Sequence, residues 1–407
     1  MNAATPALTD ATGGFHEKRD FTSRCDTKIG AAAGVAVFVP RGARAQLAAQ
    51  APARTAPPTV ISSPPRDFTP GATPVSYPDP DILTVDPGFN SLRLGNTPIQ
   101  RLWTGGLWCE GPAWSSQGRY LVWSDIPNNR QMRYLEDDGR VTVFRSPSNN
   151  SNGNAFDHQG RQLSCEHSAR RVVRYEHDGS IAVIADAYQG KRLNSPNDLA
   201  PHPDGSVWFT DPPFGGSLYE GMVDAPGGPS NPQGLLNAKA GQPVGAGLIK
   251  RELDSNIYRA DPSGRVDLVI NQQDLGGAGN GIAFSPDYKK VYIVARGGVV
   301  VADVTAQNKP VNLKMFSDFM IDGIRCGPDG IRVDVYGNLW SGSNAGNNIG
   351  YSGVTVWSPE GKLLGRIRLP EVCANVAFGG PKRNRLFMAA GQSLYAVYTN
   401  TQGASPG

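Results

Sequence analysis

Six polar side chains of related chemistry recur along the chain, each at the start of a strand–turn–strand phrase. They are Glu110, Asn154, Asn197, Asn280, Asp329 and Asn375. All six carry a side-chain oxygen, whereas an ordinary set of turn residues would also include Ser, Thr and Gly. Carboxylate and amide oxygens are the donors that hard cations such as Ca²⁺ prefer. If the fold gathers the six positions, the sequence predicts a cation site; the alternative is that each residue only caps its own turn.

The six phrases alternate with hairpins that contain Asp-Gly, Ser-Gly or Glu-Gly turns. The phrases are residues 111–125, 154–166, 197–211, 280–294, 329–343 and 375–389, and the hairpins are residues 132–144, 172–184, 257–270 and 354–369. Repeated four-stranded units are typical of a propeller, in which the inner strand of each blade lines a central channel. We therefore expect an all-β, six-bladed β-propeller over residues 98–400, with the six oxygen-bearing residues at one mouth of its channel.

The composition favours a turn-rich protein that acts on small molecules. The 407 residues include 49 Gly and 33 Pro, which favours many turns over long helices. The net charge is only +3 and no long basic run occurs, which argues against nucleic acid as a partner. Beyond residue 60 no apolar run is long enough for a membrane span. The cysteines are widely spaced and form no Cys-x-x-Cys pair, so we expect buried free thiols rather than disulfides.

Three segments differ in composition from the repeated phrases. Residues 1–55 combine a basic stretch, a short apolar core and an Ala-x-Ala site, which predicts an export signal and a periplasmic or secreted protein. The alternative is a disordered N-terminus on a cytoplasmic protein. Residues 56–97 are expected to be a Pro/Ala-rich lead-in and extension, with 51–80 a linker or unfolded. Residues 216–250 are rich in Gly, Pro, Ala and Asn, and we expect them to form a long loop near the channel mouth. This loop would be either a lid over the site or a disordered segment.

Five motifs, in this order, resemble the SMP-30/gluconolactonase (regucalcin) family, and most of all its exported bacterial gluconolactonases. The motifs are EGP at 110–112, GKRLNSPNDL at 190–199, TDPPFG at 210–215, NGIAFSPD at 280–287 and GPDG at 327–330. The resemblance implies a six-bladed propeller with one divalent metal on its axis, usually calcium. It also implies four metal ligands, which at the matching positions here are Glu110, Asn197, Asn280 and Asp329.

The resemblance implies hydrolysis of a sugar lactone such as glucono-1,5-lactone. A metal with an open position would polarise the carbonyl, and Asp329 would act as base or nucleophile. The donor set does not discriminate Ca²⁺ from Zn²⁺, Mn²⁺ or Fe²⁺. The alternatives are hydrolysis of another small ester or a phosphotriester on the same site, and a calcium-binding propeller without catalysis. No Gly-x-Ser-x-Gly motif offers a serine nucleophile.

Further site residues are predicted from their neighbours in the sequence. His167, at the end of a strand in the second blade, is expected to shuttle protons or bind substrate hydroxyls, unless it is structural. Asn154 is expected to contact substrate or a metal-bound water, and Asp198 to orient its neighbour Asn197. Arg192 is expected to pair with a polar substrate group, or else to lie solvated on the surface. Asp211 is expected to form a turn rather than to catalyse.

Overall fold

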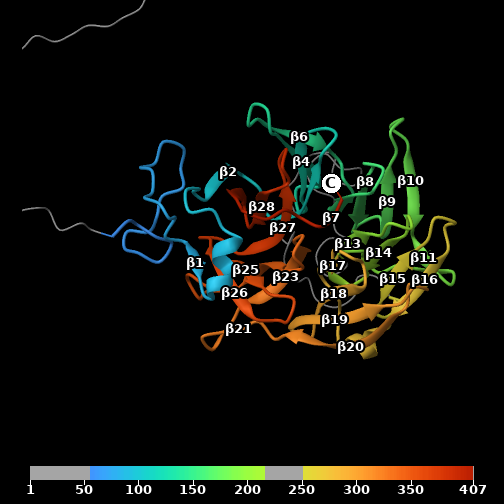
Figure 1. Ribbon diagram of the computed structural model, residues 1–407. Helices are drawn as coiled ribbons and strands as arrows, with labels where there is room; N and C mark the ends of the chain where they lie inside the picture. The colour runs from blue at the N-terminus through green and yellow to red at the C-terminus, as the bar shows by residue number, and fades with distance from the viewer. Residues whose placement is uncertain (1–55, 216–250, 407) are drawn as a thin grey trace, which may run out of the picture. The chain divides into compact units, whose positions relative to one another are not determined.

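The computed structural model describes residues 56–215 and 251–406, which form six radially arranged antiparallel sheets (Figure 1). The innermost strands of successive sheets contact one another in cyclic order around an axis. Each sheet is one blade, so the predicted all-β, six-bladed propeller is confirmed. The predicted export leader and the predicted loop at 216–250 lie outside the described residues, and export remains a prediction.

The first three blades follow one another in the chain, with strands that run from the axis outward. They comprise β3 (Cys109–Ser115), β4 (Tyr120–Asp125), β5 (Arg130–Leu135) and β6 (Val141–Arg145); β7 (Ser151–Phe156), β8 (Gln162–Glu166), β9 (Arg171–Tyr175) and β10 (Ile181–Ala185); and β13 (Leu199–Pro201), β14 (Val207–Thr210), β15 (Ile257–Ala260) and β16 (Val266–Ile270). Blades 2 and 3 are joined through the small hairpin of β11 (Ala187–Tyr188) and β12 (Lys191–Arg192).

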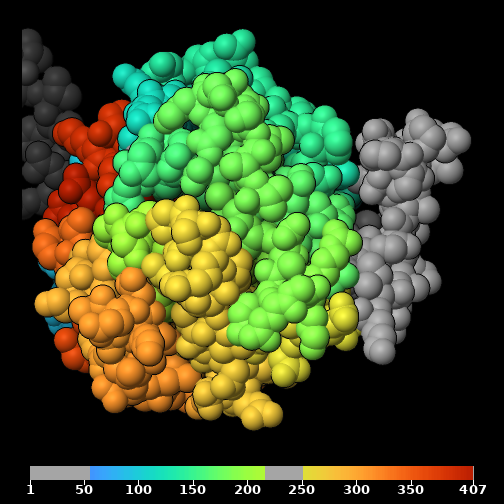
Figure 2. Space-filling model, turned by 90° about the vertical axis from the view of Figure 1, so that its right-hand side faces the viewer, coloured from blue at the N-terminus to red at the C-terminus, as the bar shows by residue number. Residues whose placement is uncertain are grey.

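The last three blades repeat this order, and two of them also take up strands from the N-terminal part of the chain. They comprise β17 (Ile282–Phe284), β18 (Lys290–Ala295), β19 (Gly298–Val304) and β20 (Pro310–Ser317); β23 (Gly327–Val333), β24 (Leu339–Asn344), β25 (Gly353–Trp357) and β26 (Leu363–Arg368); and β27 (Cys373–Gly379), β28 (Arg385–Ala390) and β29 (Ser393–Tyr398). The short elements between blades are α2 (Gln272–Leu275) and the hairpin of β21 (Met320–Ile321) and β22 (Ile324–Arg325). The surfaces of blades 2, 3 and 4, coloured green, yellow and orange, lie next to one another on the face shown in Figure 2.

The ring is closed by a strand from the beginning of the domain. β2 (Gln100–Thr104) pairs antiparallel with β29, with Gln100 opposite Ala396, and becomes the outermost strand of blade 6. β1 (Ile82–Thr84) adds a fifth strand to blade 5, with Ile82 opposite Ile367, and is followed by the 3₁₀ turn η1 (Pro87–Ser91). These pairings join the two ends of the repeat, so the propeller has no gap between its first and last blades.

Residues 57–80 differ from the expected linker or unfolded segment, because buried charges hold them against the propeller. Arg66 forms ion pairs with Asp79 at 2.8 Å and Asp81 at 3.3 Å, and all three side chains are buried. Asp81 also accepts from Arg368 Nε of blade 5 at 3.0 Å. The amino-acid composition did not predict this arrangement, because the charged residues that pair are far apart in the sequence and do not recur at a helical or strand spacing.

Tryptophans on second strands pack neighbouring blades together. Trp123, Trp208 and Trp340 are fully buried on β4, β14 and β24. The rings of Trp208 and Phe284 lie 5.3 Å apart across blades 3 and 4, and those of Trp340 and Phe378 lie 5.4 Å apart across blades 5 and 6. This aromatic packing holds adjacent blades at a fixed spacing, and so fixes the inner strands that line the axis.

Two other expectations concern membranes and thiols. In the described ranges, no helix is both long and apolar enough to cross a membrane. The four cysteines of those ranges, Cys109, Cys165, Cys326 and Cys373, are buried free thiols. The preference for buried thiols over disulfides is therefore confirmed for these four residues.

Arg66→Met tests the charged anchor of the N-terminal segment. The substitution leaves Asp79 buried without its cation, so we expect the free energy of unfolding to fall by about 3 kcal/mol. The measurement is urea unfolding followed by circular dichroism. Arg119→Met is the control, since the Arg119–Asp137 pair is largely exposed and its loss should cost under about 0.5 kcal/mol. Equal losses in the two proteins would contradict the anchor.

Candidate functional site

The predicted donors lie where the inner strands begin, and irregular strand pairing marks several of these positions. The pairing register shifts between Glu110 and Ala113, between Ser151 and Asn154, between Pro328 and Ile331, and between Cys373 and Asn375. A β-bulge of this kind adds a residue to one strand and redirects the side chains beside it. The ends of these inner strands can therefore turn polar groups toward the axis while the remainder of each strand stays in its sheet.

A hydrogen-bonded chain links donors from three blades. Asn375 Nδ2 donates to Glu110 Oε2 at 2.9 Å and to Asp198 Oδ2 at 3.4 Å. Glu110 Oε2 also accepts from the Gly111 backbone N–H. Asp329 forms a side-chain hydrogen bond with Asn280. The structure thus connects predicted ligands from different blades, and shows Asn375 as the bridge between two carboxylates.

Glycines let the inner strands approach closely enough for these contacts. A Cβ on Gly330 would lie 1.9 Å from Cγ of Asn375, and one on Gly153 would lie 2.6 Å from the carbonyl oxygen of Asn197. No side chain fits at either distance. Each glycine neighbours an oxygen-bearing residue of its own blade and touches one on the next blade, so the small size of the ring depends on both.

Three carboxylates, Glu110, Asp198 and Asp329, share this space and repel one another. Burial raises the pKa of Glu110 well above its ordinary value, and the charges of Asp329 and Asp198 raise it further. Burial and the charge of Asp198 raise the pKa of Asp329 to about 7, against a lowering effect of the hydrogen bond with Asn280. A positive ion placed among these groups would relieve the repulsion.

The donor chemistry fits a hard divalent ion. Glu110 and Asp329 supply two carboxylates, and Asn197 and Asn280 supply two amide oxygens, which are the groups such ions prefer. Across residues 56–215 and 251–406, no cluster of three or more His, Cys, Asp and Glu side chains has an arrangement that would hold a metal. Two of the four predicted ligands are Asn side chains, which do not count toward such a cluster. The metal site remains a prediction.

The propeller and its axial polar ring agree with comparison to known proteins. Residues 108–392, more than half of the chain, match the family described as SMP-30/Gluconolactonase/LRE-like region. The chain belongs to the SMP-30/gluconolactonase family. The resemblance predicted from the five motifs is therefore confirmed.

Similar members of the SMP-30/gluconolactonase family cover most of the chain. A gluconolactonase of Zymomonas mobilis is 28% identical over 346 residues, which are 79% of this chain and 87% of that protein. A pentonolactonase of Haloferax volcanii is 25% identical over 284 residues, which are 69% of this chain and 80% of that protein. The solved structure of a Xanthomonas campestris gluconolactonase is 31% identical, with a TM-score of 0.64, and the match covers 81% of this chain and 99% of that one.

Asn154 is saturated by protein partners in this family member. Its Nδ2 donates to the carbonyl oxygen of Gly111 at 2.9 Å and to Ser124 Oγ at 3.0 Å. Its Oδ1 accepts from Nε2 of Gln131 at 3.1 Å and of Gln162 at 3.2 Å. The side chain is fully buried. The predicted contact with substrate would therefore require the loss of one of these bonds, and the structure gives Asn154 a role in joining blades 1 and 2.

His167 is buried directly after β8, and its Nε2 lies 3.3 Å from Asn152 Nδ2. Burial, and then the charge of Arg251, lower the pKa of His167 to about 3. The imidazole is therefore neutral near pH 7, where a group with this pKa is a weak proton acceptor. The proton-shuttle role predicted for His167 remains a prediction, and the neutral ring suits hydrogen bonding better.

Arg192 and Asp198 lie in different environments. Arg192 is exposed on β12, where its Nη2 donates to the carbonyl oxygen of Ala169 at 2.8 Å. This matches the alternative of a surface arginine more closely than the predicted pairing with substrate. Asp198 is buried and forms an ion pair with Arg332 at 3.3 Å. Asp198 therefore lies within the polar cluster, next to the predicted ligand Asn197.

Sequence reasoning missed two participants, Arg332 and Asn375. Asn375 stood among the six phrase openers but was not assigned a role in the site. Arg332 is a charged residue between Ile331 and Val333, both of which are buried. A charge between two buried apolar residues of an inner strand was the available signal. Asp211 is buried, and its Oδ2 accepts the Asn194 backbone N–H from 17 positions earlier at 2.8 Å, so it joins two distant segments, and its role as a local turn former remains a prediction.

His167→Asn tests the buried neutral histidine through acid stability. The unfolded chain binds a proton at His167 below pH 6.5, whereas the folded protein binds one only near pH 3. Stability from this group is therefore present above pH 6.5 and is lost as the pH falls toward 3. Between pH 7 and 5, wild type should lose about 2 kcal/mol more unfolding free energy than His167→Asn. Urea unfolding at both pH values measures the difference, and equal losses would contradict the assignment.

Proposed function

We propose that this protein hydrolyses a sugar lactone, such as glucono-1,5-lactone or a related aldonolactone, to the aldonic acid. The observation that carries the proposal is the axial cluster of buried carboxylates and amides. The names of its relatives support the same chemistry, because they are a gluconolactonase and a pentonolactonase. The protein is accordingly a lactone-directed carboxylic ester hydrolase of its family.

We further propose that the reaction depends on one divalent metal, with Ca²⁺ the first candidate. Glu110, Asn197, Asn280 and Asp329 would hold it through their side-chain oxygens. When bound, such an ion polarises a carbonyl and offsets the negative charge that develops on its oxygen. The mutual repulsion of Glu110 and Asp329 supports this proposal, since both carboxylates would be neutralised by the same cation.

Asp329 would carry out the proton transfer. In the general-base form of the reaction, its carboxylate takes a proton from water as the water oxygen attacks the lactone carbonyl carbon. The bond between that carbon and the ring oxygen then breaks, and the carboxyl group returns the proton to the ring oxygen. Burial and Asp198 raise the pKa of Asp329 in the protein alone, and a bound cation would lower it, which would keep this carboxylate ionised and able to accept a proton. In the alternative, Asp329 attacks the carbonyl carbon directly, and the bond to the ring oxygen breaks as that oxygen takes a proton from water. The hydroxide formed then hydrolyses the resulting anhydride and restores the Asp329 carboxylate.

Asn375 and His167 would hold the groups around the axial site in position. Asn375 bridges Glu110 and Asp198, and so orients the Glu110 carboxylate toward the axis. His167 is neutral, and its Nε2 lies 3.3 Å from Nδ2 of Asn152, next to the glycine that contacts Asn197. Its proposed role is to hold this side of the mouth in place for substrate hydroxyls.

Asp329→Asn tests the proposed reaction. The metal-stripped protein is assayed with a pH indicator on glucono-1,5-lactone, with Ca²⁺, Mn²⁺ or Zn²⁺ added back. Wild type should regain a rate well above spontaneous opening, and Asp329→Asn should lower kcat by about 100-fold or more because it removes the base. Asp303→Asn is the control, an exposed aspartate on β19 paired with Lys290, and it should retain full activity. Turnover by Asp329→Asn at the control's rate would refute the role of Asp329.

Calcium should also stabilise the folded protein, because the proposed ligands come together only in the native state. At a Ca²⁺ concentration of 100 times its Kd, the expected gain in unfolding free energy is about 2.7 kcal/mol. Urea unfolding with and without a chelator measures this gain. Glu110→Gln removes one proposed ligand charge and should reduce the gain, whereas Asp303→Asn should keep it. A wild-type protein that Ca²⁺ does not stabilise would argue against the site.

A further inference from the structure

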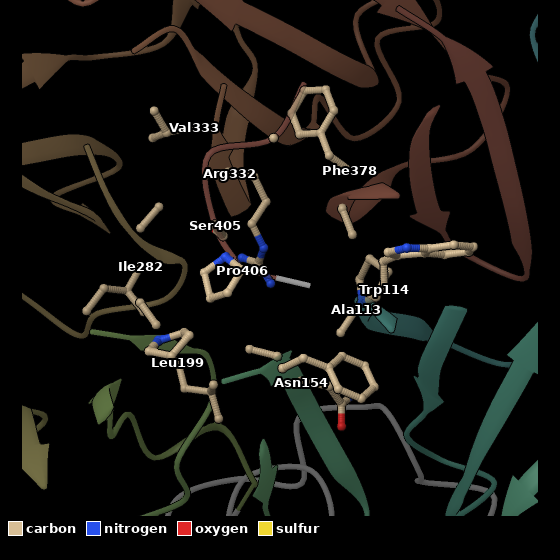
Figure 3. Close-up of a pocket in the computed structure, with 18 of the residues that line it drawn as sticks. Ala113, Trp114, Asn154, Leu199, Ile282, Arg332, Val333, Phe378, Ser405 and Pro406 are labelled. Atoms are coloured by element: carbon tan, nitrogen blue, oxygen red, sulfur yellow. The ribbon is translucent and has the colours of Figure 1, made fainter. Parts of the chain in front are cut away.

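A small cavity lies on the axis below the ring of donors. Inner strands of several blades line it, and Ser405 and Pro406 at the end of the described chain form part of its wall (Figure 3). Its volume is about 40 Å³, room for at most a few water molecules. The tail is fixed there by a hydrogen bond from the Ala404 N–H to the carbonyl oxygen of Val333 at 2.9 Å.

Arg332 brings a positive charge into this cavity. The side chain extends from β23 toward the centre, beside Pro406 (Figure 3). The residue is only 9% exposed. Its Nη1 donates to the carbonyl oxygen of Ile331 at 2.7 Å and to Asp198 Oδ2 at 3.3 Å. A guanidinium held on the axis, directly joined to the carboxylate cluster, is a costly arrangement unless its charge is used.

The bulge in β23 explains how Asp329 and Arg332 both reach the axis. Side chains alternate between the two faces of a regular strand, so residues three apart point in opposite directions. The pairing with β24 shifts by one residue between Pro328 and Ile331. This extra residue lies between Pro328 and Ile331, next to both Asp329 and Arg332, and interrupts the alternation there. One strand thereby supplies the axis with a carboxylate and a guanidinium.

Arg332 is the start of a chain of contacts that ends at a proposed metal ligand. Its Nη1 binds Asp198 Oδ2, the same oxygen accepts from Asn375 Nδ2 at 3.4 Å, and Asn375 Nδ2 also donates to Glu110 Oε2. Of the ion pairs between described residues, the Arg332–Asp198 pair is the one that reaches the carboxylate cluster. Within residues 56–215 and 251–406, the three carboxylates are therefore paired with one positive charge, and two negative charges are left over.

We propose that Arg332 is a positioning residue that sets the charge of the axial site: it neutralises Asp198, so that the remaining two carboxylates match one divalent ion. This inference rests on the metal site proposed above. Without Arg332, the site would carry a third negative charge and would favour a trivalent ion over a divalent one. A residue that only supports the fold would change the binding of both ions alike.

The test compares the affinities of Ca²⁺ and Tb³⁺, two hard ions that bind oxygen donors and differ by one unit of charge. Both are titrated calorimetrically into wild type, Arg332→Met, Arg332→Lys and Arg332→Met/Asp198→Asn. Removal of one nearby positive charge should raise the ratio of Tb³⁺ to Ca²⁺ affinity by about tenfold in Arg332→Met. Arg332→Lys retains the charge and should keep the wild-type ratio. The double variant removes both members of the ion pair, and should also return the ratio to the wild-type value.

Arg385→Met is the matched control, because Arg385 is a buried arginine paired with Glu136 away from the axis. It should leave the ratio unchanged even if it lowers stability. Circular dichroism establishes that each variant is folded, and Arg332→Gln replaces Arg332→Met if that protein does not fold. An unchanged ratio in the neutral variants would overturn the role of Arg332 while leaving the metal site intact. Wild-type protein that binds neither ion would overturn the metal site itself, and this inference with it.

Discussion

The mutual repulsion of carboxylates held out of water is the constraint on which this site depends. Glu110, Asp198 and Asp329 come from three different blades and meet near the axis, where burial makes each charge more costly. A flexible scaffold would relieve the repulsion by moving the groups apart. The propeller prevents this, because each carboxylate belongs to a strand or loop that the rest of its blade holds in place.

Several features of the fold serve to bring these groups close and keep them there. The bulges turn the ends of inner strands toward the axis, and glycines such as Gly330 let one inner strand touch the next. Asn375 joins two of the carboxylates, and Arg332 compensates one of them from below. Away from the axis, the buried tryptophans set the spacing between blades. Packing at the periphery and electrostatics at the centre are therefore parts of one arrangement.

The features that sequence reasoning could find were local ones. The six inner strand pairs and the four outer hairpins follow from alternating apolar residues and Asp-Gly-type turns, which lie within a few residues of each other. Ring closure by β2 depends on a partner strand almost 300 residues away in the chain. The amino-acid sequence of β2 does not indicate which strand it pairs with. The anchor at Arg66 was hidden in a Pro-rich composition. Arg332 was missed because strand alternation, without knowledge of the bulge, does not direct it to the axis.

The closure of the ring also sets when the site can exist during synthesis. The hydrogen bond between Asn375 and Glu110 spans 265 positions of the chain and crosses the seam between the last and first blades. β2 can pair only after β29 has been synthesised. A nascent or truncated chain thus lacks the cluster even when its early blades have folded. The axial site therefore forms only in a chain that already contains both the first and the last blade, and shorter products do not acquire its chemistry.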